Sequence, residues 1–188
     1  MGILDMLKGL LGGTAKPAVE PAFTQGESEQ VIVHRHSGFR FPQAVGDYAG
    51  VDPTQYDEKG LNVSVGYNHT KVEGLAVTVY VYPNTGGTAA LPGHCEECKA
   101  EVASSHGDVK VLSEAAFETS PNGSPSPGRK VMFSFSDDLG GIKLSSLSEL
   151  WLFSHGSLFI KYRATYPDSM KSHAPAAVEA LIKALAWP

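Results

Sequence analysis

The sequence predicts an α+β fold in which a mainly antiparallel sheet is flanked by helices and preceded by a flexible N-terminal tail. Two patterns predict it: segments with strand periodicity outnumber those with helical periodicity, and short turns join successive strands, as in antiparallel sheets. The chain has 188 residues, the usual length of one domain. Hydrophobic residues make up 42% and charged residues 19%, a composition typical of a globular protein with a core.

Strict alternation of apolar and other residues marks the predicted strands, because successive side chains of a strand point to opposite faces. The alternation is clearest in Leu61–Asn68 and Leu75–Tyr82, which a turn ending at Gly74 joins as a hairpin. A second hairpin is predicted where residues 154–157 separate Leu150–Phe153 from Leu158–Tyr166. Further strands are expected at Val31–Arg35, Phe39–Phe41, Val109–Thr119 and Val131–Ser136.

Helical spacing marks the segment Ala90–Ser105. Leu91, Cys95, Cys98 and Val102 fall at steps of four, three and four residues, so they share one face of the predicted helix.

A second helix is predicted over Ser172–Trp187. Ser172 is its expected N-cap, and Pro175 falls in the first turn, where a missing N–H does no harm. Its inner stripe consists of Ala174, Val178, Leu181, Ile182 and Leu185.

The predicted domain organisation is an N-terminal amphipathic segment with a flexible linker over residues 1–30, followed by a single α+β domain over residues 31–188. Residues 12–30 are rich in Gly, Pro, Ala and Glu, as in linkers. The apolar residues of the first three turns share one helix face: Ile3, Leu4, Leu7, Leu10 and Leu11. Three states are open for this segment: a frayed end, docking on its own domain, or contact with a membrane or partner.

Charge and cysteine content limit the function classes. Fifteen Lys and Arg against twenty Asp and Glu give a net charge of −5, and the arginines at 35, 40, 129 and 163 do not cluster, so no nucleic-acid partner is expected. Two cysteines exclude a disulfide scaffold. No apolar run approaches the length of a membrane span, and the N-terminus has no convincing signal peptide. We therefore expect a cytoplasmic protein, with weak peripheral membrane contact through the N-terminal segment left open.

Several segments resemble a known family. They are FRFP (39–42), YDEKGLNVSVGY (56–67), VTVYVYP (77–83), LFIKYRATYP (158–167) and ALAWP (184–188). Together they resemble a group of small bacterial proteins similar to the PsbP-like and DcrB-like α/β/α sandwich family. The resemblance implies that fold over residues 31–188 and a binding role, since the family includes photosynthetic extrinsic proteins, a Ran-binding nuclear-import protein and effector chaperones. One fold hosts many roles, however, so the resemblance specifies no ligand.

Cysteine and histidine pairs are the residues most suited to metal or redox chemistry. Cys95 and Cys98 form a C-x-x-C spacing, which in other settings binds zinc or cycles between dithiol and disulfide. Because both belong to the apolar helix stripe, we predict buried, reduced and metal-free thiols. His34 and His36 lie on the same side of a strand without an evident third ligand, so they are interpreted as structural. Neither a metal nor another cofactor is predicted.

The second faces of the strands carry the candidate binding residues. On the last strand Lys161 and Arg163 point away from the face that Tyr162 occupies. If the second faces adjoin, they form an aromatic surface with two cations, over which Glu101 of the helix could lie. One interpretation is a sheet face that a helix covers, with Glu101 paired to a cation. The other is a groove for a peptide or an acidic small ligand, formed by Tyr80, Tyr82, Glu101, Trp151, Lys161 and Arg163.

The sequence thus favours a non-enzymatic binding or adaptor/chaperone-like module with a protein or peptide partner. No catalytic residue is assigned, because no G-x-S-x-G elbow and no Gly-rich phosphate loop are present. The alternative is a small hydrolase or other enzyme whose site is assembled only by the fold.

Overall fold

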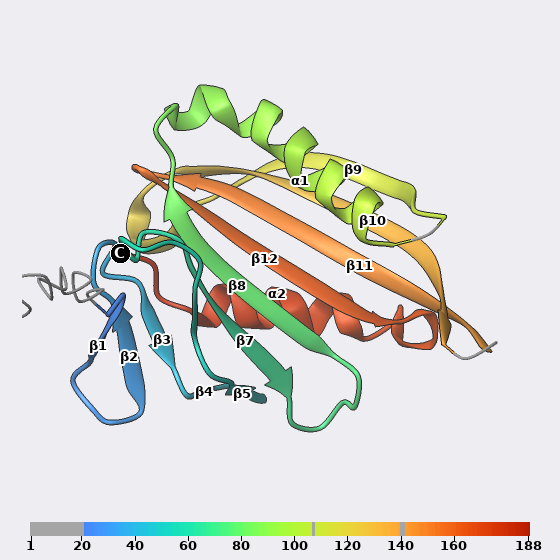
Figure 1. Cartoon of the computed structure of the whole chain (residues 1–188), viewed down its shortest axis with the longest axis horizontal. Helices are drawn as coiled ribbons and strands as arrows, with labels where there is room; N and C mark the ends of the chain where they lie inside the picture. The colour runs from blue at the N-terminus through green and yellow to red at the C-terminus, as the bar shows by residue number, and fades with distance from the viewer. Residues whose placement is uncertain (1–20, 107, 140–141) are drawn as a thin grey trace, which may run out of the picture.

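The computed structural model describes residues 21–106, 108–139 and 142–188. They form an α+β fold with a nine-stranded sheet, in which the main path of strands is β4-β5-β7-β8-β12-β11-β10-β9 and β6 pairs with β7 (Figure 1). Every pairing is antiparallel, as the sequence predicts. The strands are β4 (Ala44–Val45), β5 (Tyr48–Gly50), β6 (Thr54–Gln55), β7 (Val63–His69), β8 (Ala76–Pro83), β9 (Lys110–Thr119), β10 (Ser126–Leu139), β11 (Ile142–His155) and β12 (Leu158–Pro167).

Two helices cover opposite faces of this sheet, α1 (Leu91–Ser105) and α2 (Ala174–Ala184), so the layers are helix, sheet and helix (Figure 1). Three short 3-10 turns, Gly87–Ala90, Pro121–Gly123 and Asp168–Met170, join elements. Beside the large sheet lies a small three-stranded sheet of β1 (Phe23–Gln25), β2 (Val31–His34) and β3 (Arg40–Pro42). The expected α/β/α arrangement is therefore confirmed.

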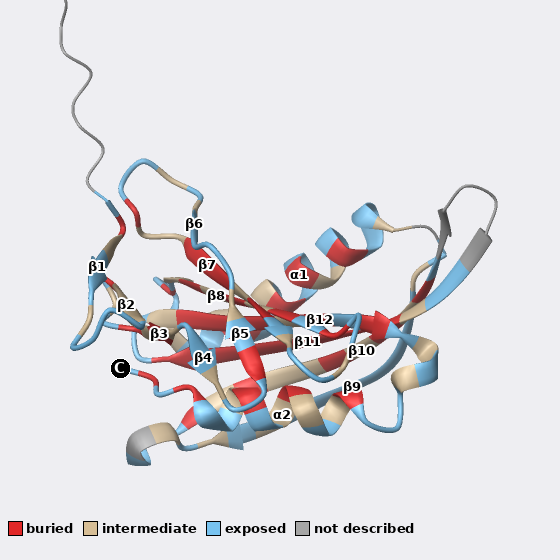
Figure 2. Cartoon of the chain, turned by 90° about the horizontal axis from the view of Figure 1, so that it is seen from below, coloured by how far each residue is buried: buried red, intermediate tan, exposed pale blue. Residues whose placement is uncertain are grey.

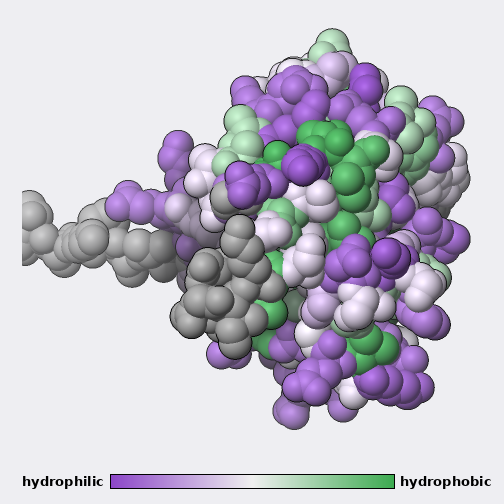
Figure 3. Space-filling model, turned by 90° about the vertical axis from the view of Figure 1, so that its right-hand side faces the viewer, coloured by the Kyte–Doolittle hydropathy of each residue, from purple (hydrophilic) through white to green (hydrophobic). Residues whose placement is uncertain are grey.

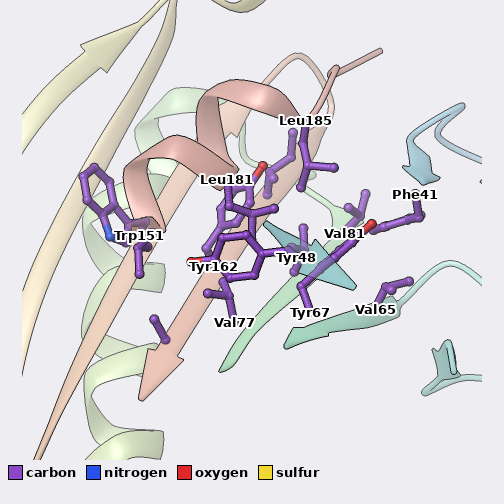
Figure 4. Packing of buried hydrophobic residues seen from close by; sticks show 14 of the residues in the cluster. Phe41, Tyr48, Val65, Tyr67, Val77, Val81, Trp151, Tyr162, Leu181 and Leu185 are labelled. Atoms are coloured by element: carbon purple, nitrogen blue, oxygen red, sulfur yellow. The ribbon is translucent and has the colours of Figure 1, made fainter. Parts of the chain in front are cut away.

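The sheet separates two hydrophobic clusters because side chains alternate along each strand. Tyr162, Ala164 and Tyr166 of β12 belong to the larger cluster, on the α2 face, together with Val178 and Leu181. Figure 4 shows Tyr162 packed beneath Leu181, with the β7 and β8 side chains beside it. Figure 2 shows that the central strands are the most continuously buried part of the chain.

The smaller cluster lies under α1. Its helix residues are the four that the sequence places on one face, Leu91, Cys95, Cys98 and Val102, and all four are buried. They pack on side chains from β10, β11 and β12: Val131, Phe133, Leu150, Leu152 and Phe159.

The C-terminal helix is shorter than predicted. It begins at Ala174 with His173 as N-cap, and no side chain caps it, so the prediction that Ser172 is the N-cap is wrong. Pro175 does occupy the first turn. The helix ends at Ala184, and the chain continues extended into the core, where the indole of Trp187 donates a hydrogen bond to the Tyr162 hydroxyl at 2.9 Å.

The folded region begins earlier than residue 31, the boundary set from the sequence. Strand β1 lies inside the predicted linker and pairs with β2, with Phe23 opposite His34, and Ala22 is buried. A strand of three residues is too short to show a period of two, which explains why the pattern gave no signal. The amphipathic segment over residues 1–12 and the first part of the linker lie outside the described residues.

Part of the apolar surface of the domain is exposed to solvent. Strand β9 is the last strand of the sheet, and most of its residues are exposed, including Val111 and Leu112. Figure 3 shows hydrophobic side chains reaching the surface among hydrophilic ones at one end of the domain. Within the described part of the chain, no helix has the length and apolar character needed to span a membrane.

Candidate functional site

An open cleft of about 510 Å³ lies where α1 leaves part of the sheet uncovered. The helix packs over β10, β11 and β12, while the outward face of β8 beside it carries tyrosines instead of small apolar residues. Five of the six predicted binding residues line this cleft: Tyr80, Tyr82, Glu101, Lys161 and Arg163. The volume lies within the range of about 300–1,000 Å³ that is usual for small-ligand sites.

Lys161 is the central cation of the cleft. Its side chain is 11% exposed, and its Nζ lies 3.3 Å from a carboxylate oxygen of Glu101. The same ammonium lies 4.6 Å from the ring centroid of Tyr80 and 5.7 Å from that of Tyr82, within the range of cation–π attraction. Glu101 therefore pairs with a cation, as one interpretation of the sequence expected, yet its own side chain is 62% exposed.

Arg163 is the second cation, and its guanidinium is poorly satisfied. One terminal nitrogen donates to the Ser148 hydroxyl at 3.3 Å, while Nε is buried without an acceptor. Among the described residues, no carboxylate lies within 4.0 Å of this side chain. Burial lowers the pKa of Arg163, because removing a cation from water disfavours its charged form. A bound anion would restore the stabilisation that this guanidinium has lost.

Tyrosines form the apolar walls of the cleft. Tyr56, from the segment between β6 and β7, stacks on Tyr80 at a centroid distance of 6.1 Å. The Tyr56 hydroxyl and the Ser64 hydroxyl lie 2.9 Å apart. Burial raises the pKa of both Tyr80 and Tyr82, so their hydroxyls stay protonated at neutral pH.

A hydrogen-bonded chain closes one end of the cleft. The Tyr82 hydroxyl lies 2.7 Å from Nε2 of His94, and Nδ1 of His94 lies 2.7 Å from a carboxylate oxygen of Glu97. His94 also stacks on Phe159 at a centroid distance of 4.4 Å. The sulfur of Cys98 is 3.9 Å from Nε2 of the same ring. The arrangement has the form of a nucleophile, a base and an orienting carboxylate.

The ionisation of these groups opposes nucleophilic chemistry. Burial raises the pKa of the Cys98 thiol and of the Tyr82 hydroxyl. A nucleophile in an enzyme site needs the opposite shift, since the thiolate or phenolate is the reactive form. The chain from Tyr82 to Glu97 therefore serves better to hold His94 and the cleft wall in place.

The prediction that Trp151 belongs to this surface is wrong. Strand register pairs Trp151 with Tyr162 and Leu152 with Lys161, so Trp151 faces α2, on the opposite side of the sheet. There Lys130 lies 4.0 Å above its ring, and its indole donates to Glu149 at 3.0 Å. The two-residue turn at Gly156 and Ser157 decides this register, because one residue more or less would exchange the two faces.

Four residues that line the cleft are absent from the predicted binding set: Tyr56, Asn62, His94 and Ser105. Tyr56 precedes a strand in a polar turn and has no periodic partner. His94 lies four residues before Cys98, which places it at the flank of the buried stripe, where it reaches Tyr82. The spacing of four residues from Cys98 is therefore the sequence pattern that could have placed His94 beside the cleft.

The cysteines and the strand histidines have structural surroundings. Cys95 and Cys98 are each 1% exposed and are not joined by a disulfide, which confirms the predicted burial. His34 is buried, and its two ring nitrogens lie 2.7 Å from the Ser37 hydroxyl and the Gly60 carbonyl. Over residues 21–106, 108–139 and 142–188, the fold brings no three His, Cys, Asp or Glu side chains together in a way that suits a metal ion.

No family model and no curated protein matches the sequence. The structure is similar to the solution structure of cyanobacterial PsbP (CyanoP) from Synechocystis sp. PCC 6803, with a TM-score of 0.49 and 11% sequence identity. The match covers 91% of this chain and 96% of that one. The function is therefore inferred from the cleft residues of this chain.

Proposed function

We propose that this protein is a non-enzymatic binding module whose α1-side cleft takes a carboxylate joined to an apolar, flat group. The observation that carries the proposal is the pair of cations among tyrosines, Lys161 and Arg163, which together have one carboxylate, Glu101, as counter-ion. A ligand carboxylate would take the place of Glu101 at Lys161 and supply an acceptor to Arg163. The ligand's flat part would lie against Tyr56 and Tyr80.

The same chemistry suits a free small molecule or the acidic and aromatic side chains of a peptide partner, which is the adaptor-like role expected from the sequence. Glu101 would compete with a ligand for Lys161, because its exposed side chain occupies the position that an incoming carboxylate needs. An ion pair of this exposure is worth up to about 1 kcal/mol, so a ligand can displace it.

A hydrolase is the alternative class, and the chain from Tyr82 through His94 to Glu97 is the feature that resembles one. The raised pKa of Tyr82 and of Cys98 favours binding over catalysis, because neither group is a nucleophile while protonated.

The test is a titration of the isotope-labelled protein with 3-phenylpropionate, followed by amide chemical shifts. Its neutral counterpart, 3-phenylpropanamide, has the same ring and chain without the charge. We expect shifts at cleft residues with the acid and much weaker ones with the amide. Equal responses to the two probes would contradict an anion site.

Variants of the charged cleft residues test the roles of Lys161 and Glu101 separately. Lys161→Met keeps the approximate length of the side chain and should weaken the preference for the acid, because only Arg163 then remains as a cation in the cleft. Glu101→Gln should tighten binding about two- to fivefold, because it removes the internal competitor. Glu96→Gln is the matched control: it changes the charge of the same helix equally, but Glu96 pairs with Lys99, outside the residues that line the cleft. Tighter binding in both glutamine variants would indicate a general charge effect and not a site.

A further inference from the structure

A second cleft lies on the opposite face of the sheet, beside α2, and is independent of the proposed ligand site. Its volume is about 380 Å³. Strands β9, β10 and β11 form its floor, and one side of α2 forms its wall. The apolar side chains that line it are Ala115, Phe117, Trp151, Phe153 and Ile182. We call this site the α2 groove.

The floor of the α2 groove is a set of interlocked aromatic rings. Phe117 stands edge-on to Trp151 and to Phe153, at centroid distances of 5.3 and 5.2 Å. Gly128 makes room for this packing, since a Cβ at that position would lie 2.8 Å from the Phe117 ring. Figure 4 shows Trp151 beside α2, apart from the group around Tyr162 and Leu181. The floor is thus preformed and apolar, which suits an apolar side-chain stripe.

We propose that residues 1–12 of this chain dock in the α2 groove as an amphipathic helix. Their five apolar residues recur at helical spacing on one face, and in water that face would remain unburied. Burying each Leu or Ile is favourable, whereas an isolated helix of this length is marginal in water, so the segment needs a surface to lie on. Twelve residues make a helix of about 18 Å, close to the length of the eleven-residue α2 that borders the groove.

The start of the described chain and the groove lie at the same end of the domain. The carbonyl of Ala22 accepts a hydrogen bond from the amide of Arg35, in the turn that ends at Gly38. Gly38 lies beside Pro188, because a Cβ atom added to Gly38 would lie 3.8 Å from the Cβ atom of Pro188. Trp187 is the residue before Pro188. The centroid of its ring lies 4.7 Å from that of Phe153, which lines the groove. Residues 12–20 span roughly 30 Å when extended, enough to cover this series of contacts.

The charges also agree with an intramolecular contact. The segment has one acidic and one basic side chain, Asp5 and Lys8. The groove rim has both signs, with Glu179 between Lys183 at 3.7 Å and Lys130 at 4.0 Å. A segment without excess positive charge is attracted weakly to anionic lipid, whereas a short linker holds it near its own groove at an effective concentration in the millimolar range.

Trp151 supplies the test. In the full-length protein labelled with nitrogen-15, the Trp151 indole reports on the groove floor, and the backbone amide of Cys98, buried under α1 on the opposite face of the sheet, is the internal control. Deleting residues 1–20, which keeps β1, should shift the indole signal of Trp151, leave the amide signal of Cys98 nearly unchanged and lower the Tm by a few degrees. Leu7→Asp should reproduce the shift. Gly9→Asp adds the same charge off the apolar stripe and should not.

A groove variant completes the design. Ile182→Asp should weaken docking, and Leu7→Asp should have no further effect in that background. Three results would overturn the proposal: a Trp151 signal indifferent to the deletion, a shift that depends on protein concentration, and one that needs lipid vesicles. The second would indicate docking on another copy, and the third a membrane contact.

Discussion

The carboxylate of Glu149 lies on the α2 face of the sheet and is 0% exposed, so its hydrogen bonds must replace water. Three groups supply them: the Tyr166 hydroxyl at 2.6 Å, the Trp151 indole at 3.0 Å and the Lys130 ammonium at 3.1 Å. Changing Tyr166 to Phe removes the shortest bond and leaves the ring in place. The variant isolates one hydrogen bond to a buried carboxylate.

The expected cost follows from that geometry. Hydrogen bonds to charged groups contribute about 1.5–3 kcal/mol, and here no water can take the place of the lost donor. In a protein of this size, 1 kcal/mol lowers the Tm by about 2–4 °C, so we expect Tyr166→Phe to lower it by about 3–12 °C.

Thermal and urea unfolding measure this cost, with Tyr56→Phe as the control. Tyr56 is 52% exposed and bonds to the Ser64 hydroxyl, so water can replace the lost contact and the effect should be below about 0.5 kcal/mol. The Glu149→Gln variant completes a double-mutant cycle, in which Tyr166→Phe should cost less. If Tyr166→Phe is as harmless as Tyr56→Phe, the network around Glu149 does not stabilise the fold as argued.

Three further predictions follow from buried groups. Burial raises the pKa of Cys95 to about 11, so iodoacetamide should alkylate it slowly at pH 7.5 and rapidly after unfolding; fast labelling of the folded protein, detected by mass spectrometry, would contradict this burial. Burial likewise raises the pKa of Tyr48 to about 12. Both groups ionise at lower pH in the unfolded chain, so the free energy of unfolding, measured in urea, should fall as the pH rises above 9. A free energy of unfolding that stays constant up to pH 11 would contradict this expectation. Gly128→Ala should cost about 1–3 kcal/mol by chemical denaturation, because its Cβ would meet Phe117 at 2.8 Å and Phe153 at 3.0 Å.

Much of the fold could be predicted where periodicity extends over many residues. The stripe of α1 and the alternation of β7, β8 and β12 specify both the element and its buried face. Strands β10 and β11 are each fourteen residues long, far beyond their predicted apolar parts, because backbone pairing continues where the side chains are polar. Strands of two or three residues, such as β4 and β6, contain too few side chains for any pattern.

The candidate site was predictable in part, for a physical reason that Trp151 illustrates. Alternation assigns residues to one of two faces within a strand, but it does not say which faces of neighbouring strands coincide. That depends on register, which the turn at Gly156 and Ser157 sets. Lys161, Arg163 and Tyr80 were grouped correctly, since Lys161 pairs with Tyr80 across the β8–β12 ladder. His94 and Tyr56 come from other elements and meet the cleft only in the folded chain.

The position of β9 at the end of the sheet bears on how the protein behaves at high concentration. A strand edge of ten residues can template addition of a strand from another molecule, which is the first step of aggregation. Charged side chains recur along it at Lys110, Glu114 and Glu118. The carboxylate of Glu114 is already paired on its own molecule, with the Lys99 ammonium at 2.8 Å and the Arg129 guanidinium at 3.5 Å. A strand that added at this edge would have to pack beside these charges, which disfavours the pairing. The charged side chains of β9 therefore connect the composition of this edge with the stability of concentrated solutions of the protein.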